Sequence, residues 1–195
     1  EVVTRLVKQS LQPEERQSFA EDEELLARLG DLLEHHLARL AGFAAEGDGS
    51  MRLQKEAPAP QVVAAHEEAA AACLKLARNL AVGNPEIQGR WWRRGLVERL
   101  AVQARCDLAA PSGERSAAWC EAVPSFMANV LANNPELRAE ALEALWPHGL
   151  CAVLAMCWRR PDHGFLLLQN LFSGGHRRLG QDGCVFHVIL SLLRV

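Results

Sequence analysis

Four residues in the C-terminal half of the chain are of the types, His and Cys, that commonly bind metal ions. His148, Cys151, Cys157 and His163 follow one another at spacings of three, six and six positions. Zinc sites usually pair their ligands at short loop spacings, but these cysteines lie in apolar helical stretches and the sequence has no Cys-x-x-Cys pair. We therefore predict core cysteines and helix-end histidines, with no metal and no other cofactor.

The remaining motifs do not indicate catalysis either. The segment "SGGHRR" (173–178) has no preceding strand and lacks the Lys-Ser/Thr of a phosphate-binding loop. There is no Gly-x-Ser-x-Gly elbow. His35 and His36 are adjacent, so on a helix their rings point about 100° apart, and we expect a solvated pair. We predict that the chain is not an enzyme.

Composition limits the class of protein. The chain has 195 residues, 49% hydrophobic and 23% charged, and it is rich in Leu and Ala, which favours one compact helical unit. The net charge of −3 argues against general nucleic-acid binding, and no apolar run reaches the roughly 18–20 residues that cross a membrane. The first residue is not Met and the last residues are apolar, so we expect a fragment of a longer protein.

Cysteine usage suggests a compartment. The six cysteines lie at irregular spacing inside apolar stretches, and the N-terminus does not resemble a secretion signal. Such cysteines are typical of reduced core residues in a cytoplasmic protein. They are Cys73, Cys106, Cys120, Cys151, Cys157 and Cys184.

Helical spacing of apolar residues extends over most of the chain. A helix of roughly six turns is predicted from Glu21 to about Ala45, after a shorter one at about 2–11, and residues 46–60 have the Gly, Ser and Pro of a loop. Beyond the loop, helices alternate with Gly- or Pro-containing corners. They are expected at about 61–82, 86–105 (with breaks allowed at Gly89 and Gly95), 114–132, 136–146, 149–158, 163–172 and 184–195.

Three segments align without gaps and indicate an internal repeat. They are "RNLAVGNPEIQ" (78–88), "ANVLANNPELR" (128–138) and "QNLFSGGHRRL" (169–179). Each places an Asn (Asn79, Asn129 or Asn170) before a Gly/Asn corner and the start of a new helix. The spacing of about 40–50 residues is that of HEAT and armadillo repeats. We predict an all-α fold, a right-handed superhelical stack of such repeats (an α-solenoid).

The aligned segments resemble the end of the third helix of an armadillo repeat and the start of the next repeat. The third copy departs from the pattern, with Gly174-Gly175-His176 in place of the Asn-Pro pair. The resemblance covers residues 61–195 as an array truncated at its C-terminus, and residues 1–45 are expected to form an N-terminal helical cap. It implies third helices at 61–82, 114–132 and 162–172, second helices at about 95–105, 148–158 and 184–194, and first helices beginning at Pro85, Pro135 and His176.

Among armadillo proteins, the long third helices, the Cys-rich apolar faces and the corner followed by "WW" look most like the ataxin-10 family. That resemblance implies a cytoplasmic adaptor, linked to cell division and neuronal maintenance, that acts through partner proteins. The armadillo-type nucleotide-exchange factors of Hsp70 share the stacked repeats and the corner chemistry, and they are the alternative.

The three repeated asparagines have two possible roles. A side-chain amide can donate and accept at once, which suits either an extended partner peptide or a neighbouring helix end. Nuclear-signal receptors of this fold also carry Trp one turn earlier, where this chain has Lys75, Ser125 and Leu166. We therefore expect no nuclear-signal binding, and we favour helix tying over partner contact.

Trp91 and Trp92 stand beside Arg93 and Arg94 in the most unusual aromatic and basic cluster of the sequence. Consecutive residues of a helix cannot both face the core, so one Trp is expected at a repeat seam and the other partly exposed. Core packing and a partner hot spot both remain open. The candidate partner-binding residues are Asn79, Asn129, Asn170, Trp91, Trp92, Arg93 and Arg94.

Overall fold

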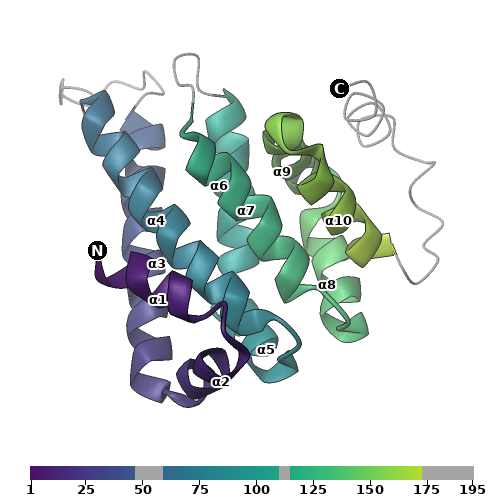
Figure 1. Ribbon diagram of the computed structural model, residues 1–195. Helices are drawn as coiled ribbons and strands as arrows, with labels where there is room; N and C mark the ends of the chain where they lie inside the picture. Colours follow the sequence, from purple (N-terminus) through teal and green to yellow (C-terminus); the bar gives the residue numbers. More distant parts are fainter. Residues whose placement is uncertain (47–58, 110–114, 173–195) are drawn as a thin grey trace.

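The computed structural model describes residues 1–46, 59–109 and 115–172 (Figure 1). Within these residues there are ten α-helices, one short 3-10 helix and no strand, which confirms the all-α prediction. The predicted helix at 184–195, the corner at 174–176 and most of the predicted loop at 46–60 lie outside them. The elements are α1 (Val2–Gln9), α2 (Pro13–Glu21), α3 (Glu23–Glu46), α4 (Pro60–Ala81), α5 (Pro85–Arg93), α6 (Leu96–Ala109), α7 (Ala117–Val130), α8 (Pro135–Leu145), α9 (His148–Ala155), the 3-10 helix η1 (Met156–Arg159) and α10 (Pro161–Phe172).

Most of the helices pack in two layers. In the front layer α1, α4, α7 and α10 lie side by side in that order, and in the back layer α3, α6 and α9 do the same (Figure 1). The short helices α2, α5 and α8 each precede a back-layer helix in the chain. The order short helix, back helix, front helix therefore occurs three times, which is compatible with an α-solenoid.

The first residues contain one more helix than the spacing predicts. A long helix is present as α3, but the residues before it form two helices, α1 and α2, where one was expected. The sequence of α2, "PEERQSFAE", has only Phe19 and Ala20 as apolar residues, so it carries no helical pattern. The side chain of Asp22 accepts a hydrogen bond from the Leu25 N–H (2.9 Å), which separates α2 from α3 by starting a new helix.

The core lies between the two layers. Five leucines of α3 are buried in this core, whereas Leu32 of the same helix is 43% exposed. Large side chains from α5 and α7 fill the middle of the core, and Trp91, Trp119 and Phe126 are each fully buried. The buried leucines of α3 are Leu26, Leu29, Leu33, Leu37 and Leu40.

The first two repeat corners have the same backbone conformation. Gly83 has φ of 67° and Asn133, at the equivalent position, has φ of 55°. This left-handed region is open to Gly, and Asn is among the few other residues that enter it readily. A left-handed residue stops the helix and turns the chain, so these two positions end α4 and α7.

The same two corners also start the next helix in the same way. Asn84 and Asn134 are N-cap residues whose side chains accept hydrogen bonds from Ile87 N–H (3.2 Å) and Leu137 N–H (3.3 Å). In each corner a Pro follows at the first helical position, where its missing N–H costs nothing. Helices therefore start at Pro85 and Pro135, as predicted.

Gly83→Ala tests whether the corner needs a left-handed residue. A Cβ at Gly83 would meet no atom within 4 Å, so any loss of stability comes from backbone strain alone. We expect a loss of about 1–2 kcal/mol in the free energy of unfolding, measured with urea. Gly42→Ala is the control, because that Cβ also meets nothing within 4 Å but lies in a regular helix. It should gain about 0.5–1 kcal/mol, and a similar effect of both changes would contradict the account.

Candidate protein-interaction surface

Asn79 joins the first two helices of the front layer. It lies near the end of α4, is 5% exposed, and its Nδ2 donates to Ser10 Oγ (3.0 Å) and to the Val7 carbonyl oxygen (3.4 Å) in and just after α1. Its Oδ1 accepts two hydrogen bonds from the Arg78 guanidinium (3.1 and 2.8 Å). Donor and acceptor are both used inside the fold, so Asn79 ties helices together.

Asn170 makes the equivalent contact at the other side of the front layer. It lies near the end of α10, and its Nδ2 donates to the carbonyl oxygen of Ala128 in α7 (2.7 Å). Asn79 and Asn170 therefore both reach back to the preceding front-layer helix. This is the helix-tying role that the sequence favoured.

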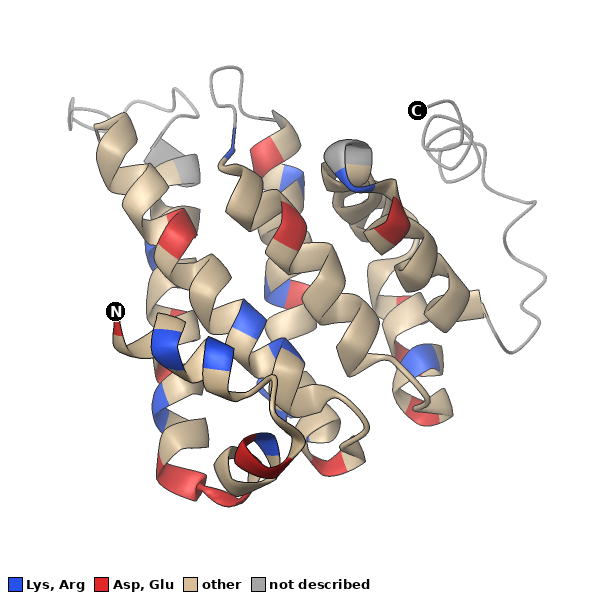
Figure 2. Cartoon of the chain, viewed as in Figure 1, with Lys and Arg blue, Asp and Glu red and all other residues tan. Residues whose placement is uncertain are grey.

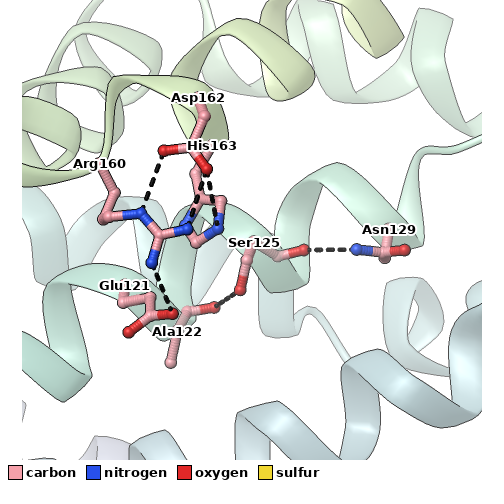
Figure 3. Close-up of polar contacts among 7 residues, drawn as sticks. All are labelled: Glu121, Ala122, Ser125, Asn129, Arg160, Asp162 and His163. Carbon is pink, nitrogen blue, oxygen red and sulfur yellow. Dashed lines mark hydrogen bonds and ion pairs between the residues drawn. The ribbon is translucent and has the colours of Figure 1, made fainter. Parts of the chain in front are cut away.

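Asn129 is placed differently from the other two. Its Nδ2 donates to the carbonyl oxygen of Ser125, one turn earlier in the same helix α7 (3.0 Å, Figure 3). The side chain is half-buried, and its Oδ1 makes no hydrogen bond within the described part of the chain. Asn129 therefore keeps a free acceptor among the described residues, unlike Asn79, whose Oδ1 is used by Arg78.

Gln88 and Arg138 connect successive units, and the sequence reasoning missed both. Gln88 Nε2 donates to the backbone carbonyl of Asn129 (3.0 Å), and Arg138 Nη1 donates to that of Asn170 (3.5 Å). The two residues occupy the last position of their aligned segments, so the same relation recurs at both corners. The alignment contained this signal, but a Gln and an Arg do not look alike unless their shared role as donors is considered.

The two tryptophans differ in exposure, as expected for consecutive residues of a helix. Trp91 is fully buried, with an Nε1 that has no hydrogen-bond partner in the described structure, and Trp92 is half-buried against the core. Arg93 is exposed. Arg94 turns to α3, where it pairs with Asp31 (3.1 Å) and Glu34 (3.2 Å). The structure therefore does not bring the whole cluster to one surface.

Arginines of α5 and α6 tie these helices to α3. Arg90 pairs with Glu23 (2.6 Å), and Arg99 pairs with Glu34 (3.6 Å). The guanidinium of Arg94 also crosses Gly30, where a Cβ would come within 2.1 Å of its Nη1. These contacts point to the back layer, whereas the contacts of Asn79 and Asn170 lie in the front layer.

A buried charge network, also missed from the sequence, fixes the start of α7. Arg115 pairs with Glu67 of α4 and Asp107 of α6, both at 2.8 Å. The Ser116 N–H donates to Glu67 (2.8 Å), and the Trp119 indole N–H donates to Asp107 (2.9 Å). Burial raises the pKa of the Asp107 carboxyl, and its Arg and hydrogen-bond partners oppose that rise. The charged groups of this network bond one another, so the network joins α4, α6 and the start of α7.

A polar cluster joins α7 to the start of α10 on the front layer (Figure 3). Arg160 contacts Asp162 (3.0 Å) and Glu121 (3.4 Å), and the hydrogen bond from Arg160 lowers the pKa of Asp162. His163 lies 3.7 Å from Asp162. Beside this cluster is a pocket of about 200 Å³, which is smaller than typical sites for small molecules. It is lined by Ala117, Cys120, Glu121, Met156 and Arg160.

Cys73 and Cys157 are buried thiols that pack in the core. Burial raises the pKa of Cys73 to about 11 and that of Cys157 to about 12, so both thiols are protonated at neutral pH. Among the described residues no three His, Cys, Asp or Glu side chains are placed to hold a metal ion. The four residues at 148, 151, 157 and 163 are therefore not assembled into such a site.

Histidines meet at the contact between α3 and α4. His36 Nδ1 lies 2.9 Å from His66 Nδ1, with ring centroids 5.1 Å apart, and His35 stands 5.4 Å from His36. The expected solvated pair is therefore wrong for His36, which is half-buried against another helix. Adjacent residues gave no hint of this contact, because it depends on how α4 packs.

Comparison with protein-family models, with curated proteins and with solved structures finds no match to this chain. Among the described helices, none is both long enough and apolar enough to cross a membrane. The function is therefore argued from the residues themselves.

The histidine contact predicts a pH dependence of stability. The pKa of His36 and that of His66 are both lowered from 6.5, first by burial and then by the neighbouring charges of His66 and Arg39, respectively. As pH falls below about 6.5 the unfolded chain takes up these protons before the folded chain, so stability decreases. The double change His36→Gln with His66→Gln should flatten the free energy of unfolding between about pH 7 and about pH 5.

His148→Gln in α9 is the control for that experiment, since it removes a histidine away from this contact. It should keep the slope of the wild-type chain. Parallel pH profiles for the wild type and the double variant would contradict the assignment.

Proposed function

We propose that this chain is part of an armadillo-type α-solenoid that acts as a non-enzymatic scaffold for other proteins. The observation that carries the proposal is the repeated corner. Gly83 and Asn133 share the left-handed conformation, and the next residues, Asn84 and Asn134, share the N-cap. Units that stack through such corners bury their apolar faces against one another and leave a long surface for partners.

The front layer is the proposed binding surface. The Oδ1 of Asn129 can accept a hydrogen bond from the backbone of an extended partner. One turn earlier in α4 and α10, the half-exposed Lys75 and the exposed Leu166 occupy the positions that flank such a partner. Nuclear-signal receptors carry Trp at these positions. Because this chain has Lys75 and Leu166 there instead, we propose a partner other than a nuclear-signal peptide.

Only some of the candidate partner-binding residues have polar groups or side-chain surface that is not already used inside the fold. Asn79 and Asn170 bond neighbouring helices, Trp91 is buried, and Arg94 pairs with α3. In our proposal the contacts therefore come from the others. They are Asn129 on the front layer and Trp92 and Arg93 at the end of α5.

The likeness to the ataxin-10 family makes a cytoplasmic adaptor our first proposal for the physiological role. Two buried thiols with a raised pKa, at Cys73 and Cys157, suit a reducing compartment.

Affinity capture from cell lysate, with the proteins identified by mass spectrometry, tests the scaffold proposal. Asn129→Ala should reduce the recovery of the partners severalfold but lower stability by no more than about 1 kcal/mol, because its one hydrogen bond stays within its own helix. Gln17→Ala, an exposed amide of α2, is the matched control and should change neither. Equal recovery with Asn129→Ala, or a large drop in melting temperature, would contradict a partner contact at Asn129.

The Hsp70 nucleotide-exchange factor is the alternative, and a separate assay distinguishes it. Release of a fluorescent nucleotide from Hsp70 is followed with and without the chain. Acceleration at about micromolar concentration would replace the adaptor proposal with the chaperone role, and no acceleration removes the alternative.

A further inference from the structure

Two segments that meet in the front layer contain cations and no acids. Residues 2–13, which include α1, carry Arg5 and Lys8, and residues 69–85, which include the C-terminal half of α4, carry Lys75 and Arg78. Neither segment contains Asp or Glu, although the whole chain has a net charge of −3. We call these four residues the basic face.

Packing brings the two segments together. Asn79, next to Arg78, donates to the backbone carbonyl of Val7, next to Lys8. The same amide donates to Ser10, just after α1. Figure 2 shows Lys and Arg on α1 and on the half of α4 nearer its C-terminal end, on the same side of the molecule. The basic face is therefore one surface built from two helices.

Within the described residues, the cations of the basic face make no ion pair. Arg78 instead donates to the neutral amide oxygen of Asn79. The arginines of α5 and α6 that point to α3 behave differently, because they pair with carboxylates there. These pairs are Arg90 with Glu23, Arg94 with Asp31 and Glu34, and Arg99 with Glu34.

Helix dipoles account for only part of the basic face. Lys8 and Arg78 lie in the last turns of α1 and α4, where a cation is stabilised by the helix end. Arg5 and Lys75 lie one turn earlier in each helix and gain less from this effect. Burial also lowers the pKa of Arg78, and the carboxylate of Glu121 only partly opposes this. A half-buried cation in this position is stabilised further by an added anion.

We propose that the basic face binds an acidic, extended segment of a partner protein, with carboxylates that reach the cations of α1 and α4. This inference rests on the proposed scaffold function and names the class of partner. Arg5 and Arg78 offer forked donors for carboxylates, and Lys8 and Lys75 act as flexible point charges.

Fluorescence anisotropy with labelled peptides tests this inference. The probes are a peptide of alternating Glu and Ser, a peptide of alternating Lys and Ser of equal length, and a single-stranded DNA oligonucleotide. The Glu peptide should bind, and its binding should weaken when NaCl rises from about 0.1 M to about 1 M, because the screening length falls from about 10 Å to about 3 Å. The Lys peptide should not bind.

The double change Lys8→Glu with Lys75→Glu should weaken Glu-peptide binding about tenfold or more. Arg39→Glu with Arg105→Glu is the matched control, because it changes the net charge equally at exposed positions of α3 and α6. The control should lose less than about twofold, and circular dichroism checks that both variants fold.

Three results would overturn the inference: no binding of the Glu peptide, equal losses in both double variants, or tighter binding of the DNA than of the Glu peptide. The same variants in lysate capture distinguish its failure from that of the scaffold function. Partners captured equally by the wild type and by Lys8→Glu with Lys75→Glu would reject the basic face and leave the scaffold standing. If the Glu peptide binds as expected but no partner is captured, the scaffold function fails.

Discussion

The side chain of Gln88 is the contact on which the stacking of the helical units depends. Its Nε2 donates to the backbone carbonyls of Ala81 at the end of α4 and of Asn129 and Ala132 at the end of α7 (3.1, 3.0 and 3.0 Å), and it is only 2% exposed. Its Oε1 accepts from Asn134, the cap of α8 (3.4 Å). Helix ends leave carbonyls without partners, and a buried carbonyl without a partner is costly. One amide thus binds carbonyls at two helix ends and joins α4, α7 and the cap of α8.

Charged side chains are also largely paired inside the fold. The acids of α3 are used by Arg90, Arg94 and Arg99, and the buried acids Glu67 and Asp107 are used by Arg115. The more exposed pairs with the acids of α3 contribute roughly 0–1 kcal/mol each, so they orient helices more than they stabilise them. With these acids committed elsewhere, the cations of α1 and of the C-terminal half of α4 have no carboxylate partner within the described part of the chain. The surface that we propose for binding carries cations that make no ion pair among the described residues.

Sequence patterns predicted the helices well where the apolar spacing was long, as in α3 and α4, and they predicted the corners from Gly/Asn and Pro. They failed for α2, because two apolar residues make no pattern. The candidate site was predicted less completely. The Asn series could be read from the alignment, but whether each amide is used inside the fold depends on the neighbouring helix. For the same reason the contact of His66 with His36 and the contacts of Glu67 with Arg115 and Ser116 could not be predicted, since they join residues 30 to 49 positions apart.

The most direct test of the role of Gln88 in joining α4, α7 and α8 is the free energy of unfolding of the Gln88→Met variant, measured with urea. Met has a similar volume but donates no hydrogen bond, so three carbonyls lose their donor, and we expect a loss of about 1–3 kcal/mol. Gln17→Met is the control for the Gln-to-Met replacement itself, because Gln17 is exposed and its hydrogen bond among the described residues is to Glu21 of its own helix (2.6 Å). The account predicts a clearly smaller loss for the control. Equal losses for the two variants would contradict a special role for Gln88 in joining the units.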